Sequence, residues 1–591
     1  MSDTHSLPAV SEQQTQHAML VIWGLYARQL GLVQALEAVK LKQKTRIHRP
    51  QTKVLEFLVA ILAGLPHLQD ISRSAHPLDQ DPVTAEAWGQ GGWADYSGVS
   101  RTLQQLSEAE VDALVSVLEA ICQPFIDQEV ERALHRQGEV VYDADLTGRS
   151  VSSTSSTYPD AAFGYMGDSI QLGYQAALVS LHSPTFGRLW LCSDLHPGDT
   201  VSVSQAQTLV RAAERRTGRR PRRRTELLAS RLAQTEAALQ AQAETVGQSQ
   251  QLQHQAQAKL EETARLVDEW EQTVKTLTLE YQQQNRQLTA HCQLSRAKRK
   301  VATYTKRLPR CQKALAVAQR RLARHQACYE QAQVHLEQLQ QHYQALLADN
   351  AANPQPIQAT FRLDGGFASR DNLAWLIEMG YDLYSRGRST PVGDRLSDAV
   401  TEETDWLRVG GNATLTAWSQ TTVADHFIYP MNVALAHYHT GHTIRRAVLL
   451  HYGQQDVTTD LKAWFQTYNG RQTIEAGIKE GKNVFQMHHL KVRSAQALRL
   501  QEQLACFAAN FVRFAAQWLA AQQATDTLST TSVKHMVQVG AHTSAWVLRQ
   551  GNVWLLRFTQ HSFYAGFSLR FGQGAIQLPL PLLNNFHFSH F

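Results

Sequence analysis

The chain has 591 residues, too many for one compact core, so two to four domains are expected. Hydrophobic residues make up 43% of the chain, an ordinary share for a globular protein. The net charge is only +5, so binding to nucleic acid would have to rely on local basic patches. Six scattered cysteines without a C-x-x-C pair argue against a disulfide framework and against a cysteine-type zinc site.

No membrane role is indicated. The first 16 residues are polar and lack the charged-then-apolar pattern of a signal peptide. The longest nearly unbroken apolar run, residues 54–65, is too short to cross a bilayer and contains Glu56. We therefore expect a cytoplasmic protein.

Residues 1–135 are predicted to form a helical domain, with amphipathic helices over 18–39 and 51–64. Ser100 is expected to cap a further helix whose first turn presents Arg101 to a phosphate. A basic segment joins the first two helices: Lys40, Lys42, Lys44, Arg46, Arg49 and Lys53. A DNA-binding domain is the favoured interpretation. The alternative is a helical packing domain with a solvated basic loop.

Residues 136–218 open with a predicted strand and turn over 139–148. Asp143 and Asp145 lie two residues apart, so their side chains share one side of that strand. Carboxylates after an apolar strand are costly unless they are solvated or bind a cation, and either Asp could do so. Two strand-like runs follow, at 171–181 and 187–193.

Residues 219–355 carry a heptad pattern in two seams, one from Leu228 to Leu288 and one from Leu294 to Leu346. The seams are out of phase across 289–293, which predicts an antiparallel coiled-coil hairpin about 80 to 90 Å long. Pro309 is expected to kink the second helix. Basic residues concentrate near the predicted tip: Arg296, Lys298, Arg299, Lys300, Lys306, Arg307 and Arg310. They indicate either an ordinary solvated face or a contact with DNA or a partner.

Residues 356–386 contain a strand that ends in Asp364, a turn at Gly365-Gly366, and a helix capped by Ser369. Residues 387–460 are predicted to be β-rich. His437, His439 and His442 have a spacing that would permit zinc binding, but surface histidines at a hairpin turn are the favoured interpretation. Two tryptophans fall in this region, Trp406 and Trp418. They are expected to pack in its core, with a role on a flipped base as the alternative.

Residues 461–530 contain Tyr468, Arg471, Glu475 and Lys482, which share one face of a predicted helix because successive offsets are three, four and seven. The carboxylate could hold a metal ion while Arg471 and Lys482 clamp phosphate oxygens. The alternative is a solvated helix face. A long amphipathic helix is predicted over 494–521, and residues 531–591 are expected to form a β hairpin and tail.

The spacing Tyr-x2-Arg-x3-Glu-x6-Lys resembles the signature helix of one branch of bacterial insertion-sequence transposases, the DDE enzymes with a β-rich insertion. Asp145-Leu-Thr147 and the block around Asp364-Gly-Gly are similar to the first and second acidic motifs of that family. The resemblance implies an α/β fold with an RNase H-like core, in which Asp145, Asp364 and Glu475 bind two Mg²⁺ ions that Mn²⁺ can replace. Asp143 is the runner-up to Asp145.

The resemblance further implies that Tyr468, Arg471 and Lys482 contact DNA phosphates. The core would then occupy residues 136–218, 356–386 and 461–530, with the β-rich insertion at 387–460. The coiled-coil hairpin departs from the family pattern and carries no implied role.

The implied function is a transposase that binds insertion-sequence ends, cleaves them and transfers the strands to target DNA. Its partners would be terminal inverted repeats, target DNA and a second copy of the chain in the bacterial cytoplasm. Two alternatives stay open: a coiled-coil structural protein that binds DNA, and a transposase that has lost cleavage. An ATPase is not indicated, because 477–483 lacks phosphate-loop spacing.

Overall fold

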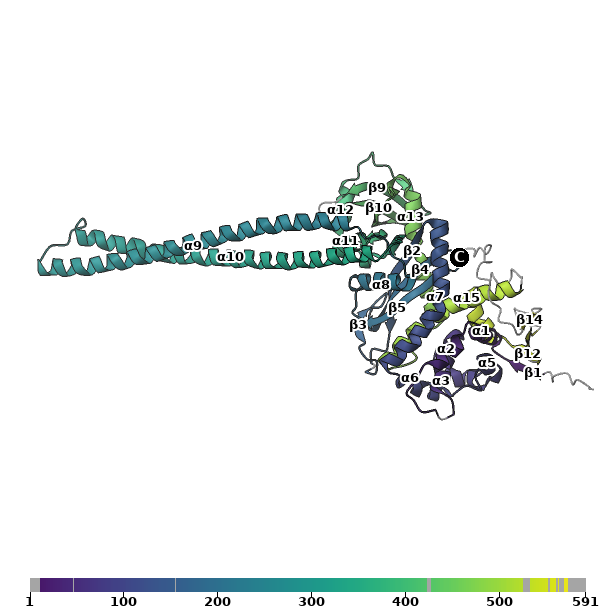
Figure 1. Cartoon of the computed structure of the whole chain (residues 1–591). Coiled ribbons are helices and arrows are strands. Elements are labelled where there is room, and N and C mark those ends of the chain that lie inside the picture. The colour runs from purple at the N-terminus through teal and green to yellow at the C-terminus, as the bar shows by residue number, and fades with distance from the viewer. Residues whose placement is uncertain are drawn as a thin grey trace, which may run out of the picture. The chain divides into compact units, whose positions relative to one another are not determined.

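The computed structural model describes residues 11–571 except 46, 155, 389, 422–426, 524–531, 551–552, 560–561 and 563–567. The chain divides into two compact units (Figure 1). The first, which we call the body, comprises Met1–Arg222 and Gln355–Phe591, and the second, the hairpin unit, comprises Arg223–Pro354. Long helices and a mixed sheet confirm the predicted α/β class.

The N-terminal part of the body is helical. The prediction of one helix over 18–39 is wrong, because Gly31 adopts a left-handed conformation (φ 74°) and separates two helices. Asp95, rather than Ser100, caps the helix that contains Arg101, so Ser100 lies inside that helix. The helices are α1 (Ala18–Gln29), α2 (Leu32–Ala38), α3 (Pro50–Leu62), α4 (Asp70–Arg73), η1 (Leu78–Gln80), α5 (Pro82–Ala87), α6 (Tyr96–Gln104) and α7 (Glu108–Gln137).

Helix α7 shows how the local sequence sets element ends. Ser107 and Glu110 form a capping box at its start, in which each side chain binds the other residue's backbone N–H. Gly138 ends the helix with a φ of 76°, a conformation that favours glycine. Strand β2 begins at the next residue, so α7 leads directly into the sheet.

The body is built on one sheet of ten strands in the described residues, in the order β3-β4-β2-β6-β7-β11-β10-β9-β8, with β5 paired to β4. The pairs β2–β6 and β6–β7 are parallel, and the other pairs are antiparallel. The strands are β2 (Glu139–Ser150), β3 (Ala162–Tyr165), β4 (Ile170–Ser183), β5 (Gly187–Pro197), β6 (Gln358–Leu363), β7 (Asp382–Gly387), β8 (Leu407–Arg408), β9 (Ala413–Thr421), β10 (Met431–Thr440) and β11 (Thr443–Tyr452).

Helices pack on this sheet and on one another. Helix α8 (Ser202–Thr217) contacts β2, β4 and β5, while α15 (Ala495–Gln523) contacts β5 and α7. By length and composition, Ala495–Ala521 could span a membrane, but 89% of its most apolar window is buried inside the protein. The bent pair α1–α2 passes the same test only when both helices are counted as one span. The burial of α15 is typical of a core helix.

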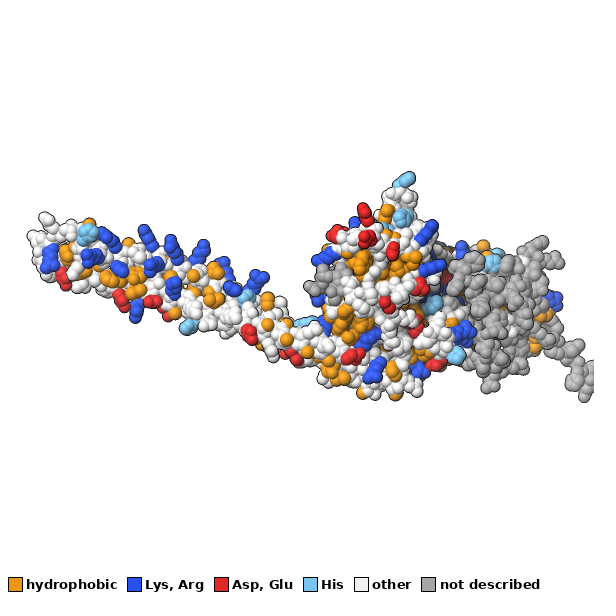
Figure 2. Space-filling model, turned by 90° about the horizontal axis from the view of Figure 1, so that it is seen from above, with side chains coloured by type: hydrophobic (Ala, Val, Ile, Leu, Met, Phe, Trp, Pro, Cys, Tyr) orange, Lys and Arg blue, Asp and Glu red, His pale blue; other side chains and the backbone are white. Residues whose placement is uncertain are grey.

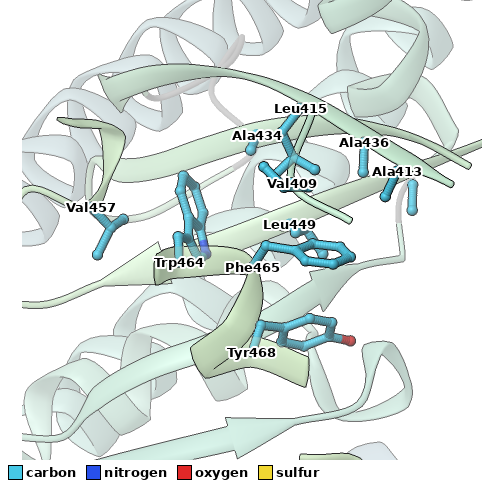
Figure 3. Packing of buried hydrophobic residues seen from close by; sticks show 11 residues of the cluster. Val409, Ala413, Leu415, Ala434, Ala436, Leu449, Val457, Trp464, Phe465 and Tyr468 are labelled. Atoms are coloured by element: carbon cyan, nitrogen blue, oxygen red, sulfur yellow. The ribbon is translucent and has the colours of Figure 1, made fainter. Parts of the chain in front are cut away.

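The region predicted as a β-rich insertion extends the same sheet. Strand β11 pairs with β7, from Val448 opposite Gly387 to Tyr452 opposite Leu383. The region also contains a helix that was not predicted, α12 (Thr390–Asp398). Its strands pack against α13 (Leu461–Asn469) through a hydrophobic cluster that includes Trp464, Phe465 and Tyr468 (Figure 3).

The first and last described strands lie in a second, smaller sheet of the body. Strand β1 (Ser11–Thr15) pairs with β12 (Ala545–Gln550), which pairs with β13 (Val553–Phe558) and then β14 (Ser568–Phe571). The strands of the predicted C-terminal hairpin are therefore present, while its expected turn at 551–552 lies outside the described residues. The remaining short elements of the body are η2 (Gly365–Phe367), α11 (Arg370–Glu378), η3 (Val457–Thr459), α17 (Val533–Gln538) and η4 (Gly540–His542).

The hairpin unit consists of two long helices, α9 (Thr225–Gln283) and α10 (Gln293–Ala351). They are antiparallel, since Ser249 contacts His325 at 2.8 Å and Thr263 contacts Cys311 at 3.6 Å. Ser249 and Thr263 are buried in the seam, so these polar contacts satisfy the positions where the heptad pattern is weak.

One prediction for this unit needs correction. Leu288 was placed in the first seam, but it lies beyond α9 and is 64% exposed, because the chain leaves the helix at Gln283. Pro309, which is predicted to kink the second helix, lies inside α10, and α10 continues on both sides of it. Its ring is exposed on the solvent side, where the helix can lose one backbone hydrogen bond while the seam stays packed.

Candidate functional site

Asp145 and Asp364 are neighbours at the end of one parallel strand pair. The pairing of β2 with β6 ends at Ala144 opposite Leu363, and the next residue on each strand is an aspartate. Strand β6 ends before Asp364 as predicted. Strand β2, however, does not end at Asp145, because it continues to Ser150 along β4.

The predicted single helix over 468–482 is in fact two helices. Helix α13 ends at Asn469, and α14 (Gln472–Asn483) begins after Gly470 and Arg471. Short-range hydrogen bonds span the junction. In one of them the Arg471 N–H donates to the Tyr468 carbonyl at 3.0 Å. A buried arginine lies against this junction: a Cβ at Gly470 would overlap the Arg362 guanidinium, and Arg362 Nη1 donates to the Thr467 carbonyl at 3.2 Å.

Arg471 lies among all three predicted acidic residues. Its Nη1 is 3.2 Å from Asp145 Oδ2, and its Nη2 is 3.9 Å from Asp364 Oδ1. Nη2 also donates to Glu475 Oε1, one helical turn further along. The structure therefore brings the three carboxylates together around one guanidinium. In the part of the chain that is described, no three His, Cys, Asp or Glu side chains form a ready-made metal-binding group.

Asp143 is engaged elsewhere. Its carboxylate is fully buried and accepts hydrogen bonds from Arg362 Nε at 2.7 Å and Nη2 at 2.8 Å. Thr473 donates a third bond at 3.3 Å. A carboxylate held this way orders the interior, so Asp145 is the Asp of this strand that faces the other acids.

The charges of the cluster act on one another. Burial raises the pKa of Asp145 to about 6, Arg471 opposes that rise, and Asp364 and Glu475 add to it. Burial lowers the pKa of Arg471, but the neighbouring anionic groups, Asp145 first, raise it above its ordinary value. The site thus favours a cation between the carboxylates.

Tyr468 and Lys482 lie on either side of the cluster along α13 and α14, and they differ in burial. Tyr468 is only 8% exposed and belongs to the cluster of Trp464 and Phe465 (Figure 3). Burial raises its pKa to about 12. It is therefore first a packing residue. Lys482 is half-buried, and burial together with Arg149 lowers its pKa.

Buried arginines around the site were missed by the sequence interpretation. Arg149 pairs with Glu502 at 2.9 Å behind Lys482. Arg188 packs against Gly477 of α14, where a Cβ would overlap its guanidinium, and lies 3.6 Å from Glu480. A signal existed for Arg149, since it follows Asp145 by four residues on the same face of β2.

A cavity of about 390 Å³ is lined by basic side chains of the sheet region beside Asp364. Arg386, Arg388 and Arg446 contribute to its wall, with α12 on the other side. The Arg386 carbonyl lies against Gly365, the residue after Asp364. The wall of the cavity is thus mainly basic, with Asp394 of α12 lying 4.0 Å from Arg446.

Among the described residues, the histidine and tryptophan candidates do not form a metal-binding group. His437 stacks on Trp406 with ring centroids 4.2 Å apart, and His439 and His442 are exposed. Trp418 is half-buried on β9. These positions fit packing and surface roles.

Comparison with protein-family models finds no match for this chain, and comparison with curated proteins finds none either.

Proposed function

We propose that the body is the catalytic part of a DDE-type transposase with an RNase H-like core. The observation that carries the proposal is the contact of one guanidinium with Asp145, Asp364 and Glu475, which come from three distant segments of the chain. Sequence motifs alone predict the same three residues as site residues. Their convergence supports a shared chemical role.

The donor set fits a hard divalent cation. Asp145, Asp364 and Glu475 offer only carboxylate oxygens, the ligands that Mg²⁺ prefers, with Mn²⁺ as a substitute. Two such ions, when bound, would supply Lewis-acid catalysis at a DNA phosphodiester. The guanidinium of Arg471 uses the same oxygens, so it and a metal ion compete for them.

Arg471 and Lys482 would act on the DNA itself. A guanidinium released from the carboxylates can bind two non-bridging phosphate oxygens and stabilise charge that develops there. Lys482 supplies a second cation two turns along α14. Tyr468 would support this face through packing.

The remaining parts of the proposal concern partners. The basic segment after α2 and the arginines around the cavity beside Asp364 would contact terminal repeats and target DNA, and two copies would hold a pair of ends in the bacterial cytoplasm. The structural alternative, a DNA-binding coiled-coil protein, has no need for three acids around Arg471. The convergence therefore favours the enzyme.

The proposal is tested by cleavage of the DNA that flanks the gene, in Mg²⁺, with Asp364→Asn. We expect cleavage to fall by at least about 100-fold, the scale seen when one electrostatic contributor is removed from a transition state. Binding of the same DNA should stay near that of the natural chain. Asp371→Asn, an exposed aspartate on α11, removes the same charge and is the control. Cleavage by Asp364→Asn at the natural rate would reject the enzyme.

A further inference from the structure

One half of helix α10 carries only positive charge. Between Gln293 and Tyr329 the sequence has no Asp or Glu. The same stretch contains eleven exposed Lys and Arg residues: Arg296, Lys298, Arg299, Lys300, Lys306, Arg307, Arg310, Lys313, Arg320, Arg321 and Arg324.

These residues form a stripe along the outside of the hairpin. When Leu294 and Leu308 are assigned to the first heptad position, ten of the eleven fall on the third, sixth and seventh positions. The third and sixth positions point away from the seam with α9 and the seventh position flanks it, and the Lys and Arg side chains on all three are exposed. The only other residues on them between Arg296 and Arg324 are Thr303, Ala314 and Val317. We call the ten residues, which omit Lys298, the basic stripe.

The charges of the basic stripe are not neutralised within the protein. In the residues that the structure describes, none of its side chains forms an ion pair. Arg299 donates to the Ala290 carbonyl at 2.6 Å, and Arg307 lies over the Tyr304 ring. Figure 2 shows Lys and Arg gathered along one edge of the hairpin.

The facing helix shows that the charge is segregated rather than merely abundant. The part of α9 from Lys259 to Gln283 has three basic residues, and it has six acidic ones: Glu261, Glu262, Asp268, Glu269, Glu271 and Glu280. A solvated coiled coil usually mixes both signs, because like charges one turn apart destabilise a helix. An unbroken basic stripe therefore lowers helix stability unless a polyanion binds it.

We propose that the basic stripe binds the phosphate backbone of duplex DNA without sequence preference. From Arg296 to Arg324 it extends about 42 Å at 1.5 Å per residue, somewhat more than the roughly 35 Å of one DNA turn. Guanidinium and ammonium groups at this spacing match phosphates rather than base edges. An anionic membrane is a poorer fit, because Val317 is the only large apolar residue on the three heptad positions between Arg296 and Arg324.

The inference rests on the proposed function, since it gives the hairpin unit a second DNA contact in a DNA-cutting enzyme. It is tested in the full chain with the triple variant Lys306→Gln, Lys313→Gln and Arg320→Gln. All three residues occupy the sixth heptad position, and Gln preserves helix propensity. The matched control removes three exposed charges from the facing helix: Lys259→Gln, Arg265→Gln and Lys275→Gln.

Binding of a random-sequence duplex of about 40 base pairs, roughly four turns, is titrated with salt in the presence of a metal chelator. Each lost phosphate contact lowers the slope of log affinity against log salt by about 0.9, so the stripe variant should lose up to about 2.7 and bind more weakly. The control should keep the natural slope. Equal losses in both variants, or no loss in either, would overturn the proposal.

Two further measurements separate the causes of failure. Binding of phosphatidylserine vesicles that depends on the stripe, without a matching effect on DNA, would overturn DNA as the partner. Cleavage is assayed in parallel with Asp364→Asn. If that variant cleaves normally while the stripe variant loses DNA affinity, the enzyme is rejected and the stripe stands. If the stripe variant binds like the natural chain while Asp364→Asn is inactive, only the stripe is rejected.

Discussion

Four arginines, each paired with a carboxylate, organise the site at the scale of single residues. Arg362 holds Asp143, Arg149 holds Glu502, and Arg188 lies beside Glu480. These three arginines are almost fully buried, and their pairs join β6 to β2, β2 to α15, and β5 to α14. Arg471 differs because it meets three carboxylates, two of which are substantially exposed. It is the arginine whose partners a ligand can replace.

Arg471→Lys is expected to slow cleavage by about 10- to 100-fold, the loss that one or two charge-assisted hydrogen bonds would cause. An ammonium cannot make the parallel pair of bonds that a guanidinium makes to one phosphate. Single-turnover cleavage measures the chemical step, and DNA affinity should change little. Arg499→Lys, on an exposed ion pair with Asp112, is the control. A rate equal to that of the natural chain would show that the guanidinium geometry is unimportant.

Glu56 gives a prediction about stability. It is fully buried in α3, accepts a hydrogen bond from the Ala94 N–H at 2.8 Å, and burial raises its pKa to about 9. As the pH rises through about 4.5, Glu56 loses its proton in the unfolded chain but keeps it in the folded chain. Because the folded pKa is raised, its contribution to stability is complete below pH 4.5 and declines as the pH rises to about 9.

Glu56→Gln keeps the acceptor and removes the titration. At pH 8 the free energy of unfolding should rise by a few kcal/mol, on the order of 1.4 kcal/mol for each pH interval of one unit that is no longer crossed. At pH 5 the variant and the natural chain should nearly agree. Urea unfolding at both pH values makes the measurement, with exposed Glu403→Gln as the control. Parallel pH curves for Glu56→Gln and the natural chain would contradict the prediction.

The site residues that could be predicted are those whose neighbours in the sequence indicate their role. Asp364 follows an apolar strand and precedes two glycines, and that pattern needs no distant partner to be recognised. The choice between Asp143 and Asp145 could not be made from the strand alone, because it depends on Arg362, which lies beside Asp143 only after β2 and β6 pair. Arg188 could not be predicted for the same reason, because its partner Glu480 lies on a helix far along the chain.

At the scale of elements, the junction between α13 and α14 shows a limit of periodicity. The spacing of Tyr468, Arg471 and Glu475 fits a continuous helix, and Arg471 does contact Glu475 one turn on. At the break, the Arg362 guanidinium of strand β6 lies against Gly470. Helical spacing predicted that Arg471 and Glu475 are neighbours, but it could not predict the position of Arg362.

The heptad pattern was more informative, because α9 and α10 bury each other locally. Leu228 and Leu346, from the ends of the two predicted seams, are both fully buried. Within the body, the backbone N–H of Ile357 donates to the carbonyl of Arg220 at 3.2 Å. The two body segments that flank the hairpin unit are thus already joined to each other.

Replacement of residues 225–349 by a short Gly/Ser linker should therefore leave the body folded. Circular dichroism and a cooperative thermal transition would show this, with the loss of helix signal that the missing helices require. The same chain should retain whatever cleavage the body performs, at reduced affinity for random-sequence duplex. An unfolded product would mean that the hairpin unit is part of the body's core.

At the scale of the whole molecule, the first and last described strands belong to one sheet. Gln13 lies opposite Val547 in the pairing of β1 with β12, and Thr15 donates to Asp81 at 2.6 Å. No sequence pattern predicts the pairing of β1 with β12, because the two strands are separated by most of the chain. Because Ser11–Thr15 is polar, its sequence alone indicates a tail. In the structure it is a strand that pairs with β12.

Deletion of residues 1–15 should leave one edge of β12 without a partner. Hydrogen–deuterium exchange of the β12 amides should become faster, and exposed edges also favour aggregation. Gln14→Ala, which keeps the backbone of β1, should exchange like the natural chain. Unchanged exchange after the deletion would show that β1 adds nothing to this sheet.

The spread of the site along the chain has a consequence for biosynthesis. Asp145, Asp364 and Glu475 must all be present before Arg471 can be surrounded. At about 5–20 residues per second, a ribosome needs roughly 15 to 70 s to travel from the first of them to the last. A message cut short, or a ribosome that stops early, yields a chain without a complete site. If the body cuts DNA, only nearly finished chains would be able to do so.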